Sequence, residues 1–71
     1  MLIKCRKHLS SQPELDFWAL QVDEDLKVVD GTTGSPMPVW LHKGDWVLLT
    51  PLGLVGACSA EAFRAMFTIV N

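Results

Sequence analysis

The chain has 71 residues, 49% of them hydrophobic and 20% charged, and its formal net charge at pH 7 is -2. This apolar content excludes a disordered protein, whose sequence could not bury enough surface to offset the entropy of ordering. A chain of this length buries only roughly 60% of its unfolded surface, which excludes two separate cores and a deep substrate cleft. We therefore expect residues 1–71 to form a single domain.

The first segment, residues 2–8 with the sequence LIKCRKH, alternates in the way expected of a short half-buried or edge strand. Its cations Lys4, Arg6 and Lys7 could contact phosphate groups. A nucleic-acid-binding domain normally carries a positive net charge, however, and this chain does not. A nucleic-acid-associated module that uses these three residues is therefore the alternative function.

Two cysteines, Cys5 and Cys58, are far apart in the sequence, and neither a secretory signal nor a membrane span of roughly 20 apolar residues precedes them. We therefore expect a cytoplasmic protein with both thiols reduced and buried, although Cys58, just before a predicted helix, also permits a lowered pKa. The two thiols, together with His8 and His42, are ligand types that zinc accepts, but only Cys5 and His8 are close to each other in the sequence. We expect no metal and no other cofactor.

Residues 15–22, LDFWALQV, permit two interpretations. Ser11 and Glu14 match the spacing of a helix capping box ahead of this segment. The segment is short, however, and contains two aromatic residues and a valine, which are enriched in strands. We expect a strand, with a helix as the open alternative.

An acidic run, Asp23, Glu24 and Asp25, follows this segment. We interpret it as a solvated turn whose negative charge could complement a basic partner. Residues 26–30 then have the pattern of a strand, and the intervening turn predicts a tight hairpin between this strand and the preceding segment.

Residues 30–38, DGTTGSPMP, contain two Gly and two Pro and predict a loop. Pro36 and Pro38 lack amide donors, so the strand that follows is expected at an edge of the sheet. Trp40 lies in that strand beside the irregular loop, and exposed tryptophan is enriched at binding hot spots. We therefore predict a partner-binding surface formed by Trp40, by Met37 in the loop, and by the acidic turn.

Residues 45–50, DWVLLT, are nearly all apolar and predict a central strand covered on both faces. Gly44 supplies the positive φ that the turn before this strand needs. Residues 51–53 should reverse the chain into residues 54–58, so that the two apolar segments pair.

A helix is predicted after Ser59, whose side-chain oxygen suits the N-cap. Its apolar stripe consists of Phe63, Met66, Phe67 and Val70. We expect this stripe to lie across the sheet, above Trp46 or Leu48. The fold class is therefore α+β: a small, strongly bent antiparallel sheet of four to six strands, with an SH3-like barrel as one arrangement, and one C-terminal helix packed on it.

The second half of the chain contains a spaced motif. Its positions are Gly44, Asp45, Trp46, Val47, Gly53, Cys58, Glu61, Phe63 and Phe67. The motif resembles the C-terminal part of a family of small, largely uncharacterised phage and prophage proteins, which carry a P-G-D-(W/Y) strand, a G-x-x-Y-x-C segment and a short F-x-x-x-(Y/F) helix. Lys43, Gly56 and Ala60 depart from the family's pattern. The resemblance implies a phage origin and no catalytic residues.

No nucleophile elbow and no Gly-rich phosphate loop occurs in the sequence, so we expect no enzyme. We predict a phage-encoded accessory protein of the host cytoplasm that binds a host or phage protein, for example by inhibiting a host enzyme such as RNA polymerase or a defence nuclease. A structural component of the virion or of its assembly is a further alternative. The oligomeric state is left open, a homodimer included.

Overall fold

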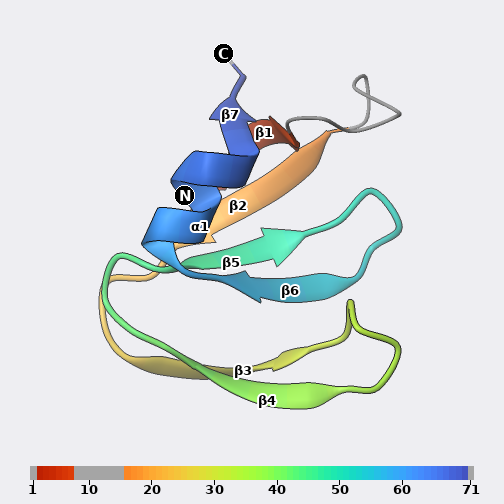
Figure 1. Ribbon diagram of the computed structural model, residues 1–71, viewed down its shortest axis with the longest axis vertical. Helices are drawn as coiled ribbons and strands as arrows, with labels where there is room; N and C mark the ends of the chain where they lie inside the picture. The colour runs from red at the N-terminus through yellow and green to blue at the C-terminus, as the bar shows by residue number, and fades with distance from the viewer. Residues whose placement is uncertain (1, 8–15, 71) are drawn as a thin grey trace.

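The chain forms an antiparallel β structure with one short helix, seen in a computed structural model that describes residues 2–7 and 16–70 (Figure 1). Within these residues the strands are β1 (Ile3–Lys7), β2 (Phe17–Gln21), β3 (Leu26–Asp30), β4 (Met37–Leu41), β5 (Trp46–Leu49), β6 (Val55–Cys58) and β7 (Phe67–Ile69). The helix α1 (Ala60–Met66) connects β6 to β7. No helix in this part of the chain is long and apolar enough to cross a membrane. This mostly antiparallel β structure with one short helix is compatible with the predicted α+β class.

Five strands form one sheet in the order β6-β5-β2-β1-β7, and all neighbouring strands in it are antiparallel. The other two strands pair only with each other and form a two-stranded sheet, the β3–β4 hairpin. Figure 1 shows this hairpin beyond the β6 edge of the five-stranded sheet. The two sheets are joined there by a backbone hydrogen bond of 2.8 Å from the Gly31 amide to the Val55 carbonyl.

The core lies on one face of the five-stranded sheet, because alternate residues of each strand point to the same side. Its buried members are Cys5, Ala19, Leu48, Cys58, Phe63 and Phe67. Trp46 packs against this cluster and stacks on Phe63, with ring centroids 4.1 Å apart. Phe17 meets Phe67 edge to face at 5.3 Å. The predicted position of the helix above Trp46 is therefore confirmed.

Local chemistry sets the turns and the start of the helix as predicted. Gly44 and Gly53 have φ values of 96° and 83°, a left-handed conformation that side chains with a Cβ rarely adopt. The Ser59 side chain accepts a hydrogen bond of 3.1 Å from the Ala62 amide and so caps α1. β5 pairs with β6 across the turn at Gly53, which confirms the predicted pairing.

The first strand is half-buried, as one of the two alternatives predicted, but it is interior in the sheet, so the alternative of an edge strand is wrong. Cys5 of β1 lies opposite Phe17 of β2 on one side and opposite Ile69 of β7 on the other. The sequence pattern does not predict β7, because Phe67 continues the helical spacing of the apolar stripe. The chain instead becomes extended at Phe67 (φ -127°, ψ 149°) and runs into the β-branched residues that follow, which favour a strand.

The helix ends earlier than the predicted apolar stripe requires. Phe63 and Phe67 are buried, but α1 ends at Met66, whose side chain is 39% exposed. Val70 lies beyond β7 and is not part of the helix.

β2 confirms the strand interpretation of residues 17–21, whereas the capping-box residues lie outside the described part of the chain. The predicted hairpin between residues 26–30 and the preceding segment is wrong, because β2 pairs with β1 and β5. The reason lies just after β2, where Val22 exchanges backbone hydrogen bonds of 2.9 Å with Gly44 and Asp45. β3 is thereby left to pair with β4.

Two further expectations change in detail. β4 begins at Met37, so the loop between β3 and β4 is shorter than predicted. β5 is paired on both sides, as expected of a strand inside the sheet, but it is not covered on both faces, since Leu49 is exposed.

Candidate docking surface

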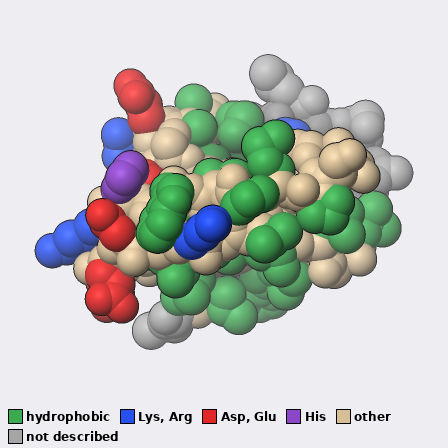
Figure 2. Space-filling view, turned by 90° about the horizontal axis from the view of Figure 1, so that it is seen from below, with side chains coloured by type: hydrophobic (Ala, Val, Ile, Leu, Met, Phe, Trp, Pro, Cys, Tyr) green, Lys and Arg blue, Asp and Glu red, His purple; other side chains and the backbone are tan. Residues whose placement is uncertain are grey.

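The β3–β4 hairpin presents one face to solvent. Lys27 lies opposite Trp40, and Val29 lies opposite Pro38. Because side chains alternate along a strand, these four residues share one side of the hairpin, which we call the outer face. Trp40 is 63% exposed and Val29 is 58% exposed. Figure 2 looks onto this side of the molecule and shows hydrophobic side chains gathered across its middle.

The opposite side of the hairpin turns toward the rest of the protein. Leu41 is only 3% exposed, and Val28 and Val39 are half-buried. Leu26 and Met37 lie on the same side near the two ends of the hairpin and remain exposed, so only Leu41, Val28 and Val39 are covered by the rest of the protein.

One end of the hairpin is fixed by the Asp30 carboxylate. It accepts hydrogen bonds from the Thr32 amide (2.8 Å), from the Thr32 hydroxyl, and from the Ala57 amide in β6 (3.1 Å). These bonds, led by the one from the Thr32 hydroxyl, hold the pKa of Asp30 below its usual value. Gly56 permits this close approach, because a Cβ at that position would lie 3.1 Å from the Thr32 methyl group.

The other end of the hairpin is fixed by Asp45. One oxygen of its carboxylate accepts a hydrogen bond of 2.8 Å from the His42 amide, and the other accepts one of 3.0 Å from the Ala60 amide at the start of α1. The bond from His42 is the largest cause of a lowered Asp45 pKa. Ionised Asp30 and Asp45 therefore hold the outer face in a set orientation relative to the five-stranded sheet.

The acidic turn lies at the Asp45 end of the hairpin. Asp23, Glu24 and Asp25 are all exposed, and the Asp25 carboxylate lies 3.5 Å from His42 Nδ1. Trp40 is close to this end, since its partner Lys27 follows the turn by two positions. In Figure 2, acidic, basic and histidine side chains gather at one end of the apolar area. The structure thus brings the acidic turn and Trp40 to the same half of the hairpin.

Met37 lies elsewhere. It pairs with Asp30 at the far end of the hairpin, and its register places it on the opposite side from Trp40. Met37 is 55% exposed, but it does not share the outer face. The surface around Trp40 is formed instead by Lys27, Val29 and Pro38.

Lys27 adds a cation to the outer face. Its Nζ lies 5.9 Å from the centroid of the Trp40 ring, within the range of a cation–π contact. Sequence reasoning missed Lys27, Val29 and Pro38 because their common side becomes visible only when the pairing of β3 with β4 is known.

The three N-terminal cations do not form one basic patch. Arg6 Nε donates a hydrogen bond of 2.9 Å to Asp16, and Lys4 Nζ lies 3.7 Å from the same carboxylate. The bond from Arg6 is the main reason for the lowered pKa of Asp16. Lys7 falls on the other side of the sheet, with Cys5. Asp16 thus offsets part of the positive charge that the nucleic-acid alternative requires.

The two thiols are buried and free, as predicted. Burial is the first cause of the raised pKa of both Cys5 and Cys58, and the nearby Asp45 carboxylate raises that of Cys58 further. The alternative of a lowered Cys58 pKa is therefore wrong. His8 lies outside the described residues, and His42 is exposed at the hairpin end. Among residues 2–7 and 16–70, no group of three or more His, Cys, Asp or Glu is placed to hold a metal ion.

A second apolar area lies on the side of the five-stranded sheet that faces away from the core. Trp18 of β2 lies opposite Leu49 of β5, which lies opposite Val55 of β6. Each of these residues is about 40% exposed, so the row is less exposed than Trp40 and Val29 on the outer face of the hairpin.

Comparison of the chain with protein-family models, with curated proteins and with solved structures finds no match. The resemblance to small phage proteins therefore stays a prediction.

Proposed function

We propose that this protein acts by binding another protein through the outer face of the β3–β4 hairpin, and that it has no catalytic role. The proposal rests on one observation: Trp40 is 63% exposed although it stands in a paired strand that is fixed at both ends. An exposed indole on a rigid element loses little conformational entropy on binding, which is the usual property of a hot-spot residue.

The neighbours of Trp40 support the same proposal. Val29 and Pro38 extend the apolar surface, and Lys27 and the acidic turn provide polar groups around it. An apolar centre with a charged rim is the usual anatomy of a protein interface. We propose that the partner is a host or phage protein in the host cytoplasm, and that the protein is a phage-encoded accessory factor, for example an inhibitor of a host enzyme.

We also propose that the five-stranded sheet is a partly open, SH3-like barrel, with the β3–β4 hairpin inserted in the chain between β2 and β5. The sheet order β7-β1-β2-β5-β6 and the short helix before the last strand support this assignment. In this arrangement the hairpin is an addition to the barrel, and it provides the surface for recognition.

The test compares proteins retained from a host lysate by the wild type and by Trp40→Ala. The matched control is Leu52→Ala, which removes an apolar side chain that is 87% exposed on the turn between β5 and β6. We expect a partner whose affinity, remeasured with purified components, falls about 30-fold with Trp40→Ala, as at a hot spot of about 2 kcal/mol.

The control variant should retain the partner with unchanged affinity. Equal affinity of the partner for wild type and Trp40→Ala, with both proteins folded by circular dichroism, would show that the outer face is not the docking surface.

A further inference from the structure

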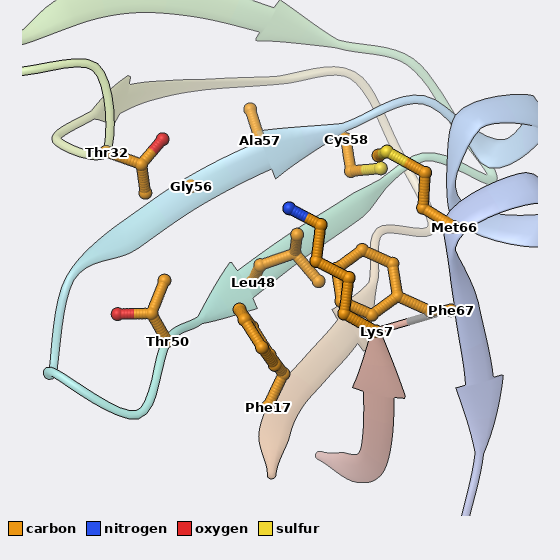
Figure 3. Close-up of a pocket in the computed structure, with 10 residues that line it drawn as sticks. All are labelled: Lys7, Phe17, Thr32, Leu48, Thr50, Gly56, Ala57, Cys58, Met66 and Phe67. Atoms are coloured by element: carbon orange, nitrogen blue, oxygen red, sulfur yellow. The ribbon is translucent and has the colours of Figure 1, made fainter. Parts of the chain in front are cut away.

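A hollow of about 340 Å³ opens on the core side of the five-stranded sheet. The residues labelled in Figure 3 come from β1, β2, β5, β6, α1 and β7, with Thr50 from the turn after β5 and Thr32 from the hairpin loop at the margin. This volume is at the lower end of the range of roughly 300–1,000 Å³ that small-molecule sites occupy. The hollow is separate from the outer face of the hairpin, since Trp40, Val29 and Lys27 do not line it.

The floor of the hollow is apolar and belongs to the packed core. Leu48, Cys58 and Phe67 are buried, and Phe17 and Met66 form its sides. Phe17 is held against Phe67 by their edge-to-face contact. Because Leu48, Cys58 and Phe67 are fixed by packing in the core, the floor of the hollow is formed before any ligand enters, which reduces the entropic cost of binding.

Lys7 is the only charged side chain in the described lining of the hollow. In Figure 3 it extends from β1 toward the middle of the lining residues. Lys4 and Arg6 on the same strand are paired with Asp16, whereas no ion pair or hydrogen bond of the Lys7 side chain is found within the described chain. An unpaired ammonium group beside an apolar floor is complementary to a ligand with one negative charge and an apolar body.

The polar groups at the margin favour the same ligand. The Thr32 hydroxyl is bonded to Asp30, and the Thr50 hydroxyl accepts a hydrogen bond from the Leu54 amide. Asp30 itself is already satisfied by its donors in the hairpin loop and β6. Among the described lining residues, the hollow therefore offers one charged group without an ion pair, Lys7, beside an apolar floor and a polar margin.

The geometry points to a binding site for a small aliphatic carboxylate, with its chain on Phe17, Leu48 and Phe67 and its carboxylate on the Lys7 ammonium. This inference goes beyond the proposed docking function and does not depend on it. Trp40→Ala should leave this site unchanged.

The experiment titrates decanoate at pH 7 into the full-length isotope-labelled protein and follows amide chemical shifts by NMR. Decanol and decyltrimethylammonium serve as ligands with the same chain and a neutral or positive head. We expect saturable shifts centred on Leu48, Cys58 and Met66. Decanoate should bind about tenfold more tightly than decanol, because a charge-assisted hydrogen bond is worth roughly twice a neutral one.

Three variants make this test more specific. Lys7→Gln should reduce the preference for decanoate over decanol to within about twofold, whereas Lys43→Gln, an exposed lysine in the turn before β5, should leave it at about tenfold. Met66→Trp places a larger side chain at an exposed position beside the hollow and should weaken both ligands, with amide-shift dispersion as the check on folding.

Three results would overturn the inference: equal affinity for decanoate and decanol in the wild type, an unchanged preference in folded Lys7→Gln, or shifts centred on the hairpin around Trp40. The absence of saturable shifts below the micelle concentration would also reject the site.

Discussion

The five-stranded sheet and the β3–β4 hairpin use their apolar residues in different ways. In the sheet, the rings of Trp46, Phe63 and Phe67 stack in series over a buried floor. In the hairpin, Leu41 is buried but Trp40 is not, and the attachment depends on carboxylates that accept backbone hydrogen bonds. The comparison indicates that the sheet supplies most of the folding free energy, whereas the outer face of the hairpin is available for recognition.

The largest loss of stability is expected when the centre of the aromatic stack is removed. Phe63→Ala deletes the ring that contacts both Trp46 and Phe67 and leaves a cavity under α1. We expect a loss of about 3–4 kcal/mol in the free energy of unfolding, measured by urea denaturation. A loss below about 1 kcal/mol would mean that the stack is not the centre of stability.

Releasing the hairpin should have a smaller effect. Asp30→Asn removes the charge that strengthens the bonds from Thr32 and Ala57, and we expect a loss of about 1–2 kcal/mol. Hydrogen exchange should accelerate in β3 and β4 more than in β2 and β5. Asp23→Asn, at an exposed position without such bonds in the described structure, is the matched control and should change neither quantity.

Low pH should weaken the attachment of the hairpin to β6, because it protonates the Asp30 carboxylate. The folded-state pKa of Asp30 is lowered, so its stabilising contribution is complete above the unfolded value of about 4 and disappears as the pH falls through the lower folded value. Wild-type stability should therefore decline below about pH 4 more steeply than that of Asp30→Asn. The lowered pKa values of Asp16 and Asp45 add to the decline in both proteins. If the free energy of unfolding falls equally steeply with pH in both proteins, the ionised Asp30 carboxylate does not stabilise the fold.

The contact between hairpin and β6 can be tested through its closest approach. Gly56→Ala places a Cβ 3.1 Å from the Thr32 methyl group, and we expect a loss of about 1 kcal/mol because Asp30 holds Thr32 in place. In a Thr32→Ser background the hydroxyl remains and the methyl is gone. Gly56→Ala should then cost less than half as much, and an equal cost in both backgrounds would contradict the assigned contact.

The smallest effect on stability is expected at the outer face. Trp40→Ala removes a mostly exposed side chain, so the free energy of unfolding should change by less than about 0.5 kcal/mol. Thermal and urea unfolding provide the measurement, with Trp46→Ala as the contrasting core variant. A loss near 2 kcal/mol with Trp40→Ala would mean that Trp40 supports the fold, and the division between sheet and hairpin would fail.

Local sequence signals predicted the parts of the fold that depend on neighbouring residues. Gly44, Gly53 and Ser59 have conformational or capping roles that can be recognised without tertiary information. The pairing of β5 with β6 follows because the turn between them is short. The helix above Trp46 follows from the spacing of its apolar residues.

Long-range pairing was not predictable in this way. The sequence next to β2 favours a hairpin with β3, and only the bonds of Val22 to Gly44 and Asp45 show why β2 pairs with β5 instead. The same limitation affects the docking surface. Trp40 and the acidic turn were recognised by residue type, whereas Met37 was included because it is near Trp40 in sequence, although the register places it on the other side.

The interior position of β1 has a consequence for how the protein is made. Its partner β7 lies at the far end of the described chain, where Arg6 pairs with Thr68. During synthesis, one side of β1 stays unpaired until residues 67–69 have left the ribosomal exit tunnel. Contacts so distant in sequence also slow the final step of folding. Nascent chains stalled before Phe67 should consequently remain susceptible to protease, whatever the state of the hairpin.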